Sequence, residues 1–157
     1  MPFKSFVRAL LTFKKQDKLR FKTPDTKDSE LALTKIKEEY PFFTFFQTWA
    51  DISKVLCFED HEDIIEEYQE YLRWDFLSCN IYHVEYIKKY KNRMDWYYFC
   101  TYVECPEEIL EEYFEYLNIL QLCKHQNLSK DFIQRHPETF IKNKAVYHLV
   151  LCYQYNI

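Results

Sequence analysis

A four-residue phrase recurs along the chain at steps of 22, 23 and 23 residues. An apolar residue, two mostly charged residues and then a Tyr or a His make up the phrase, which stands at 65–68, 87–90, 110–113 and 133–136. Self-similarity at a short, fixed period is typical of stacked repeat arrays, in which each repeat packs on its neighbours. The sequence therefore predicts a fold that is determined by packing between adjacent repeats. Folds of this kind usually serve as binding surfaces.

The recurring phrase lies in the first of two amphipathic segments in each repeat. Within 106–117 the apolar residues at 109, 110, 113, 116 and 117 follow the spacing of one helical face. This segment is therefore predicted to be a helix, which we name helix A. Pro106 suits its first position, because the first N–H of a helix is unpaired in any case. In the third repeat Ser129 is the predicted N-cap of helix A.

A second, shorter amphipathic segment starts at Trp74, at Trp96 and at Ile119. We name it helix B, expect it to span roughly eight to ten residues, and predict Asp95 and Asn118 as N-caps. Helices this short are marginal alone in water, so each must be stabilised by the next hairpin.

Weaker copies of both segments extend the pattern in each direction. Residues 36–40 and 49–53 match helices A and B upstream, and 142–155 fills the place of a last helix B. The sequence therefore predicts an all-α fold, a short solenoid of about five helical hairpins over residues 29–157, with degenerate first and last hairpins. Residues 1–28 are predicted to be a separate basic N-terminal arm or amphipathic helix.

The 157 residues contain no glycine. Phosphate-cradling loops, nucleotide fingerprints and tight β-hairpins need glycine, so the composition argues against all three. A content of 48% hydrophobic and 20% aromatic residues is ample for the core of one domain. No apolar run approaches the roughly 18 to 20 residues of a membrane span, and the N-terminus lacks a secretion signal. We therefore expect a protein that is not secreted and has no transmembrane segment.

Six cysteines without a secretion signal are expected to be reduced thiols. Cys57 with His61, and Cys79 with His83, each place a thiol and an imidazole one helical turn apart. Two such pairs are able to form a tetrahedral zinc site if they meet in space, but ordinary packing is the default interpretation. Cys105 directly precedes a helix N-terminus, which can modestly stabilise a thiolate, yet no base for a nucleophile is identifiable.

Three pairs of neighbouring glutamates recur on the polar face of helix A, at 66–67, 107–108 and 111–112. A solvated helix face explains them better than a catalytic dyad, which requires burial to separate two pKa values. The sequence therefore predicts no catalytic residue, no metal site and no cofactor, and we expect that the protein is not an enzyme.

Charge is distributed unevenly between the arm and the rest of the chain. Residues 1–27 carry eight basic and two acidic groups, a net charge of about +6, which leaves 13 basic and 23 acidic groups, about −10, on the remainder. Phe3, Phe6, Val7, Leu10 and Leu11 give the arm an apolar helical stripe. The arm is therefore able to pack on its own array, dock in a partner's groove, or bind a membrane surface or nucleic acid.

A second candidate for partner binding is the aromatic run at 40–49, which holds six aromatic residues. These residues either close the start of the array or form a partner-binding patch. The residues predicted to bind a partner come from this run and from the arm: Phe3, Phe6, Arg8, Lys14, Lys15, Lys18, Arg20, Phe42, Phe43, Phe45 and Phe46.

A longer motif occupies the third repeat and is accompanied upstream by Trp49-x-x-Ile52-Ser53. It reads Ile119-x-x-Leu122-Cys123-x-x-Gln126-x-Leu128-Ser129-x-x-Phe132-Ile133-x-x-His136. Together the two phrases resemble short two-helix repeats, with Trp-x-x-Ile-Ser and Leu-Ser-x-x-Phe-Ile phrases, in proteins of large DNA viruses. The resemblance covers about residues 29–142. The chain departs from that pattern at Ile81 and Val103, in place of Gln, and at Cys100 and Cys123, in place of Ser.

The resemblance implies a viral interaction or structural protein without catalytic residues, located in the virion or the host cytoplasm. On that basis we expect a minor capsid-associated or cement-like component that bridges larger proteins. One alternative is a soluble viral factor that binds a host protein. Another is a protein whose basic arm binds nucleic acid or a membrane surface, although the acidic array would repel a long duplex.

Overall fold

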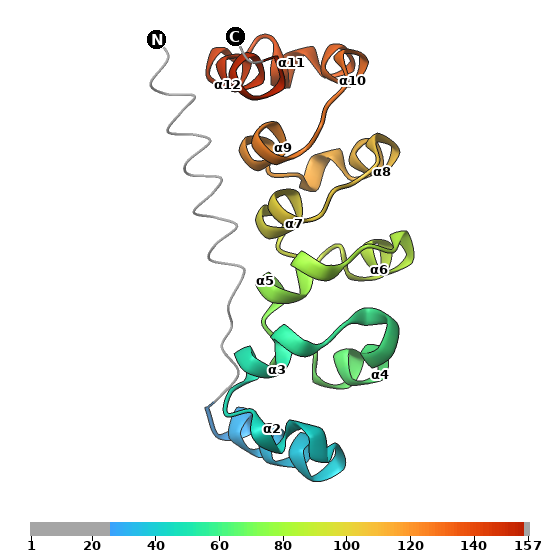
Figure 1. The fold of residues 1–157 in the computed structure, drawn as a ribbon, viewed down its shortest axis with the longest axis vertical. Coiled ribbons are helices and arrows are strands. Elements are labelled where there is room, and N and C mark those ends of the chain that lie inside the picture. The colour runs from blue at the N-terminus through green and yellow to red at the C-terminus, as the bar shows by residue number, and fades with distance from the viewer. Residues whose placement is uncertain (1–25, 156–157) are drawn as a thin grey trace. The chain divides into compact units, whose positions relative to one another are not determined.

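The computed structural model describes residues 26–155, which form eleven α-helices and three 3-10 helices with no strand among them (Figure 1). The prediction of an all-α fold is therefore confirmed. The chain divides into two compact units, Met1–Phe45 and Phe46–Ile157. Within the described residues no helix combines the length and the hydrophobicity that crossing a bilayer requires.

The described part of the first unit contains α2 (Thr26–Glu39) and η1 (Pro41–Phe45). Helix α2 ends before Pro41 because proline disfavours helical backbone in the residue that precedes it. The N–H of Tyr40 still donates to the Ile36 carbonyl at 2.8 Å, and the N–H of Phe43 donates to the Tyr40 carbonyl at 2.9 Å. The Phe43 ring makes edge contacts with the rings of Tyr40 and Phe42, so the aromatic run turns tightly on itself.

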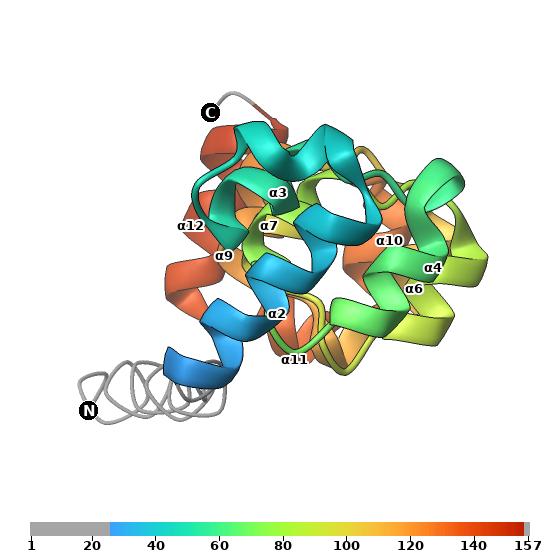
Figure 2. The ribbon, with the colours of Figure 1, turned by 90° about the horizontal axis from the view of Figure 1, so that it is seen from below.

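The second unit contains two sets of helices that alternate along the chain. The helices at helix-B positions are α3 (Trp49–Val55), α5 (Trp74–Leu77) continued by η2 (Ser78–Asn80), α7 (Trp96–Tyr102), α9 (Ile119–His125) and α12 (Lys144–Gln154). The helices at helix-A positions are α4 (Phe58–Tyr68), α6 (Val84–Tyr90), α8 (Glu107–Glu112) and α10 (Lys130–Arg135), with η3 (Phe114–Tyr116) and α11 (Pro137–Phe140) as connectors. Each set forms its own column (Figures 1 and 2). Neighbours in the helix-B column contact one another.

The predicted N-caps are present. Asp95 accepts from the N–H groups of Tyr97 and Tyr98, Asn118 from that of Gln121, and Ser129 from that of Phe132. These side chains satisfy helix N–H groups that have no partner inside the helix. The start of each of these helices is therefore marked by its own sequence.

Three details of the predicted helices were wrong. Helix A of 106–117 is shorter than expected: α8 ends at Glu112, because Tyr113 leaves helical geometry (φ −110°, ψ 20°), and η3 follows. Pro106 is the N-cap residue of α8 rather than its first residue. The helices B α3, α7 and α9 are also shorter than the expected eight to ten residues, since they have 7 residues each, whereas α12 has 11.

A buried serine connects successive helices B. The Ser53 hydroxyl donates to the Trp49 carbonyl at 2.6 Å and accepts the backbone N–H of Arg73, just before α5, at 2.8 Å. Ser78 accepts the N–H of Asp95, just before α7, at the same distance. Cys100 occupies the equivalent position in α7, and the N–H of Asn118 hydrogen-bonds its thiol. The departure from Ser to Cys therefore keeps an acceptor, although a weaker one, at this position.

The tryptophan that starts helix B joins two neighbouring repeats. The indole N–H of Trp74 donates to the Gln69 carbonyl at 3.0 Å, and that of Trp96 donates to the Lys91 carbonyl at 2.9 Å. In this way each indole satisfies a carbonyl at the end of the preceding helix A. Each ring also contacts the Tyr of the following helix A: Trp74 lies 5.3 Å from Tyr90, and Trp96 lies 5.9 Å from Tyr113.

Two glutamines fix the ends of helices B in the second half of the unit. The amide of Gln126 donates to the carbonyls of Cys100 (2.9 Å) and Val103 (2.8 Å) and accepts the N–H of Cys105 (3.1 Å). Gln154 repeats the arrangement one step later, with the carbonyls of Cys123 and Gln126 and the N–H of Leu128. Gln126 thus binds the end of α7 and the residue before α8, and Gln154 binds the end of α9 and a residue just before α10.

Candidate functional site

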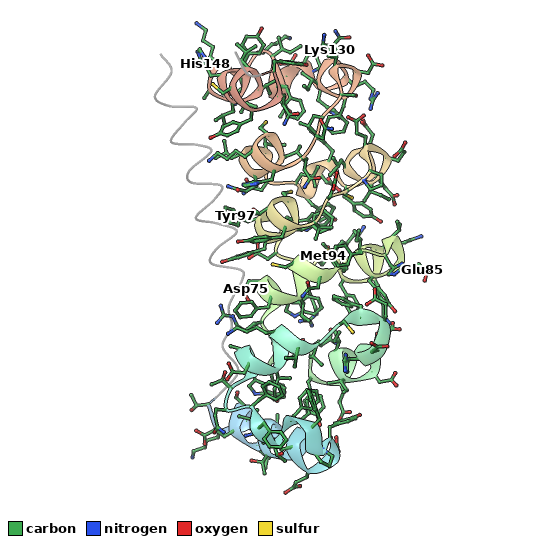
Figure 3. The ribbon with its side chains drawn as sticks, viewed as in Figure 1. Asp75, Glu85, Met94, Tyr97, Lys130 and His148 are labelled. Carbon is green, nitrogen blue, oxygen red and sulfur yellow. The ribbon has the colours of Figure 1, made fainter. Side chains whose placement is uncertain are left out.

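The two columns of the second unit differ in charge: most charged side chains of the helix-A column are acidic, whereas the helices of the helix-B column carry few charges and are rich in aromatic side chains. Figure 3 shows Asp75 and Tyr97 on the helix-B side and Glu85 on the helix-A side. Each column therefore offers a different kind of surface to a ligand or partner.

The helix-A carboxylates pair with cations of the next helix A. Glu62 lies 2.6 Å from Lys89 Nζ, and Glu111 lies 3.2 Å from an Arg135 guanidinium nitrogen. Glu66 also pairs with Lys89, and hydrogen bonds from Lys89 and then from Tyr90 lower the pKa of Glu66. These side chains are largely exposed, so each pair contributes little to stability. A lowered pKa is the opposite of what a general acid needs at neutral pH, and this face is therefore an ion-paired helix surface.

A cluster of aromatic and basic side chains lies on α5, α7 and the adjoining residues of the helix-B column. We call it the tyrosine face and define it as Lys54, Arg73, Phe76, Tyr97, Tyr98 and Tyr102, with Asp75 beneath it. Three observations connect its members.

The first observation is a two-point ion pair at the base of the tyrosine face. Arg73 Nε donates to Asp75 Oδ1 at 3.1 Å, and Arg73 Nη2 donates to Asp75 Oδ2 at 2.6 Å. The Asp75 side chain is 9% exposed and that of Arg73 is 44% exposed. A bidentate pair of this kind holds the guanidinium in one orientation. The Arg73 side chain is thus fixed while a large part of it faces solvent.

The second observation is that cations lie over the Phe76 ring. Lys54 Nζ lies 5.0 Å from the ring centroid, and the guanidinium carbon of Arg73 lies 5.5 Å from it. Cation–π contacts at these distances are attractive, so residues of α3 and α5 share this part of the face.

The third observation is the tyrosine group on α7. The ring centroids of Tyr97 and Tyr98 lie 5.4 Å apart, and the rings of Tyr98 and Tyr102 stack at 6.2 Å. Burial raises the pKa of Tyr98, and the carboxylates of Asp75 and Asp95 raise it further. The phenol therefore stays a neutral hydrogen-bond donor at physiological pH. Tyr102 is 62% exposed, so the edge of the group is open to solvent.

The structure locates only part of the residue set predicted to bind a partner. Phe42 is 61% exposed, Phe45 is 83% exposed, Phe46 is half-buried, and Phe43 is buried at 2%. Phe42 and Phe45 are thus accessible, while Phe43 belongs to the core. The predicted arm residues Phe3, Phe6, Arg8, Lys14, Lys15, Lys18 and Arg20 lie outside the described residues.

The four residues considered for zinc have separate partners. Cys57 Sγ lies 3.4 Å from His61 Nδ1, which also accepts the backbone N–H of Cys57. The Cys79 thiol donates to the Asp75 carbonyl at 3.2 Å, and His83 Nε2 lies 3.2 Å from Glu59. Over residues 26–155 no three Cys, His, Asp or Glu side chains are placed to hold a metal ion together.

The structure does not favour a thiolate at Cys105. Burial raises the pKa of Cys105 to about 11. Desolvation of the charged form outweighs the favourable field of the short helix α8. Cys105 is therefore protonated at neutral pH. It lines a shallow hollow of about 310 Å³ with Glu107 and Ser129 among its neighbours, where Ser129 Oγ donates to Glu107 at 2.8 Å.

Sequence reasoning did not find the tyrosine face. The available signal was the cluster Tyr97, Tyr98 and Tyr102 inside a helix whose core positions are already occupied by Trp96, Phe99 and Val103. Tyrosines at the remaining positions have to point away from that core. Comparisons with protein-family models, with curated proteins and with solved structures gave no match for this chain.

Proposed function

We propose that this chain is a non-enzymatic protein-interaction protein, an α-solenoid of five A/B hairpins whose helix-B column binds a partner protein. In this assignment α2 is the first helix A and α12 is the last helix B. The contacts made by Ser53, Ser78 and Cys100 support the solenoid, because the same position joins successive helices B at three steps.

The tyrosine face is the observation that carries the proposal. Tyr, Trp and Arg are the residue types most enriched among side chains that dominate binding energy at protein interfaces. In this chain three tyrosines and a guanidinium held by Asp75 stand together on a rigid helical scaffold. Because Arg73 is already oriented, binding costs less side-chain entropy than it would for a mobile arginine.

The resemblance to two-helix repeat proteins of large DNA viruses supports a more specific role. We propose that the protein is a minor structural component of the virus, capsid-associated or cement-like, that bridges larger proteins. In this role the tyrosine face supplies one contact. The exposed rings of Phe42 and Phe45, together with the basic arm, supply a second.

The test is to capture the partner of the full chain from its native source and to measure the affinity of the purified pair. The double variant Tyr98→Ala, Tyr102→Ala is expected to raise the dissociation constant about 100-fold, because it removes two adjacent aromatic anchors. Tyr82→Ala is the matched control, since Tyr82 is 61% exposed and lies outside the tyrosine face. This control is expected to change the dissociation constant by less than about threefold.

Equal affinities for the wild type and the double variant would exclude the tyrosine face as the binding site. The identity of the partner tests the finer role. An abundant protein of purified virus particles supports the structural assignment, whereas a host protein that is absent from particles supports a host-directed factor.

A further inference from the structure

The charged side chains that face solvent around the tyrosine face are mostly basic. The Lys54 side chain on α3 is 52% exposed, that of Arg73 before α5 is 44% exposed, and Lys124 is exposed in the last turn of α9. Helices α7 and α9 contain no carboxylate side chain. A ligand that lies along these helices therefore meets more positive than negative charge.

The acidic residues of the same region are mostly engaged inside the fold. Asp75 is buried and holds Arg73 by two hydrogen bonds. Asp95 is buried and caps α7. The Asp51 side chain is 41% exposed and lies 3.9 Å from Lys54, at the α3 end of the region. The negative charge is thus largely internal, whereas the positive charge faces solvent.

The tyrosines add hydrogen-bond donors to this positively charged surface. The phenol of Tyr98 is neutral, because burial raises its pKa, and a neutral phenol can donate its O–H. Tyr102 is exposed over most of its surface. Ammonium and guanidinium groups only donate hydrogen bonds, and a carboxylate only accepts them. A ligand with carboxylates for these donors and apolar side chains for the rings therefore matches the face.

Two lysines lie at the ends of one row, with the tyrosines of α7 between them. Lys54 Nζ lies 5.0 Å from the centroid of the Phe76 ring on α5. At the other end the Thr101 hydroxyl on α7 donates to Gln121 Oε1 on α9 at 3.2 Å, and Lys124 follows Gln121 by one helical turn. Helices α3, α5, α7 and α9 follow one another along the column (Figure 1). Three steps of about 9 Å each give about 27 Å, which roughly eight residues of extended chain can span.

We infer, on the basis of the proposed function, that the partner protein binds the tyrosine face through an extended acidic segment of roughly eight residues. Its carboxylates pair with Lys54 and Lys124 and accept hydrogen bonds from the tyrosines of α7. Its apolar or aromatic side chains cover Phe76 and the tyrosine rings. The segment does not suit the helix-A column, because most charged side chains there are acidic and repel it.

Zero-length cross-linking of the full chain tests this inference at individual lysines. The probe is a random copolymer of glutamate and tyrosine, and a carbodiimide joins its bound carboxylates to lysine amines. Mass spectrometry is expected to find about tenfold more coupling at Lys54 and Lys124 than at Lys88 and Lys142. The two comparison lysines are exposed on α6 and after α11, away from the tyrosine face. Each lysine is read separately, so probe bound elsewhere on the chain does not affect the comparison. Equal coupling at all four lysines would overturn the inference.

Charge reversal tests the same inference on the captured partner. Lys54→Glu with Lys124→Glu is expected to raise the dissociation constant about tenfold, because two carboxylates then face an acidic segment. Lys88→Glu with Lys142→Glu is the matched control and is expected to change it by less than about threefold. Both pairs make the same change in net charge, so only the place of the charge differs.

The outcomes separate this inference from the function on which it rests. A partner that loses affinity for Tyr98→Ala, Tyr102→Ala but binds both lysine pairs like the wild type would leave the tyrosine face as the binding site and overturn the acidic segment. A partner that also binds the tyrosine variant like the wild type would overturn both.

Discussion

Replacing Trp96 with Ala is expected to lower the free energy of unfolding by about 4 kcal/mol. Trp96 is 7% exposed, its indole donates to the Lys91 carbonyl, and its ring stacks on Tyr113 and Tyr116. Truncation removes the packing and the hydrogen bond together. Urea unfolding followed by far-UV circular dichroism measures the loss.

Trp96→Phe separates the two contributions. The phenyl ring keeps most of the stacking but cannot donate, so a smaller loss of about 1.5 kcal/mol is expected. Tyr82→Ala controls for loss of an exposed aromatic ring and is expected to stay within about 0.5 kcal/mol of the wild type. A loss below about 1 kcal/mol for Trp96→Ala would show that this side chain does not join its neighbouring repeats as described.

Replacing Gln126 with Leu is expected to lower the free energy of unfolding by about 3 kcal/mol. Gln126 is 4% exposed and pairs with two carbonyls and one N–H. Leucine fills similar space and leaves those three buried groups without their partner. The expected loss of stability does not come from a steric clash of the leucine. Two other repeats bury an apolar side chain, Ile81 or Val103, at the position equivalent to Gln126.

Gln134→Leu is the control for Gln126→Leu. Gln134 is exposed on α10, so the same chemical change there is expected to alter stability by no more than about 0.5 kcal/mol. Both variants are compared in the urea titration used for Trp96. Equal stability of the two would contradict the assignment of Gln126 as the residue that fixes the end of α7.

The sequence predicted the local features of this fold better than its surfaces. The N-caps Asp95, Asn118 and Ser129 were found because a cap depends on a few neighbouring residues. The early end of α8 was missed because apolar spacing continues through Leu117 while the backbone changes direction at Tyr113. Periodicity detects a buried face, but it does not detect where a helix gives way to a 3-10 turn.

The tyrosine face was missed for a related reason. The face forms because residues of α5 and α7 come close across a repeat boundary, as Tyr98 and Asp75 do. The sequence of a single repeat does not show which residues of the next repeat it will approach. The thiolate considered at Cys105 is disfavoured because burial, which cannot be read from residue type, decides the sign of the pKa shift. The predictions for the basic arm concern residues outside the described part and stay predictions.

Amide hydrogen exchange at four residues tests most directly whether neighbouring helices B hold one another as described. The N–H groups of Arg73 and Asp95 donate to Ser53 and Ser78 of the preceding helix B, and those of Cys105 and Leu128 donate to Gln126 and Gln154 at the end of the following helix B. The Phe99 N–H, which donates to the Asp95 carbonyl inside its own helix, is the internal comparison. We expect the four amides to exchange on the order of 1,000-fold more slowly than in an unstructured peptide and within about tenfold of Phe99. Exchange at the unstructured rate, with Phe99 still protected, would contradict the account by showing helices that form without stacking.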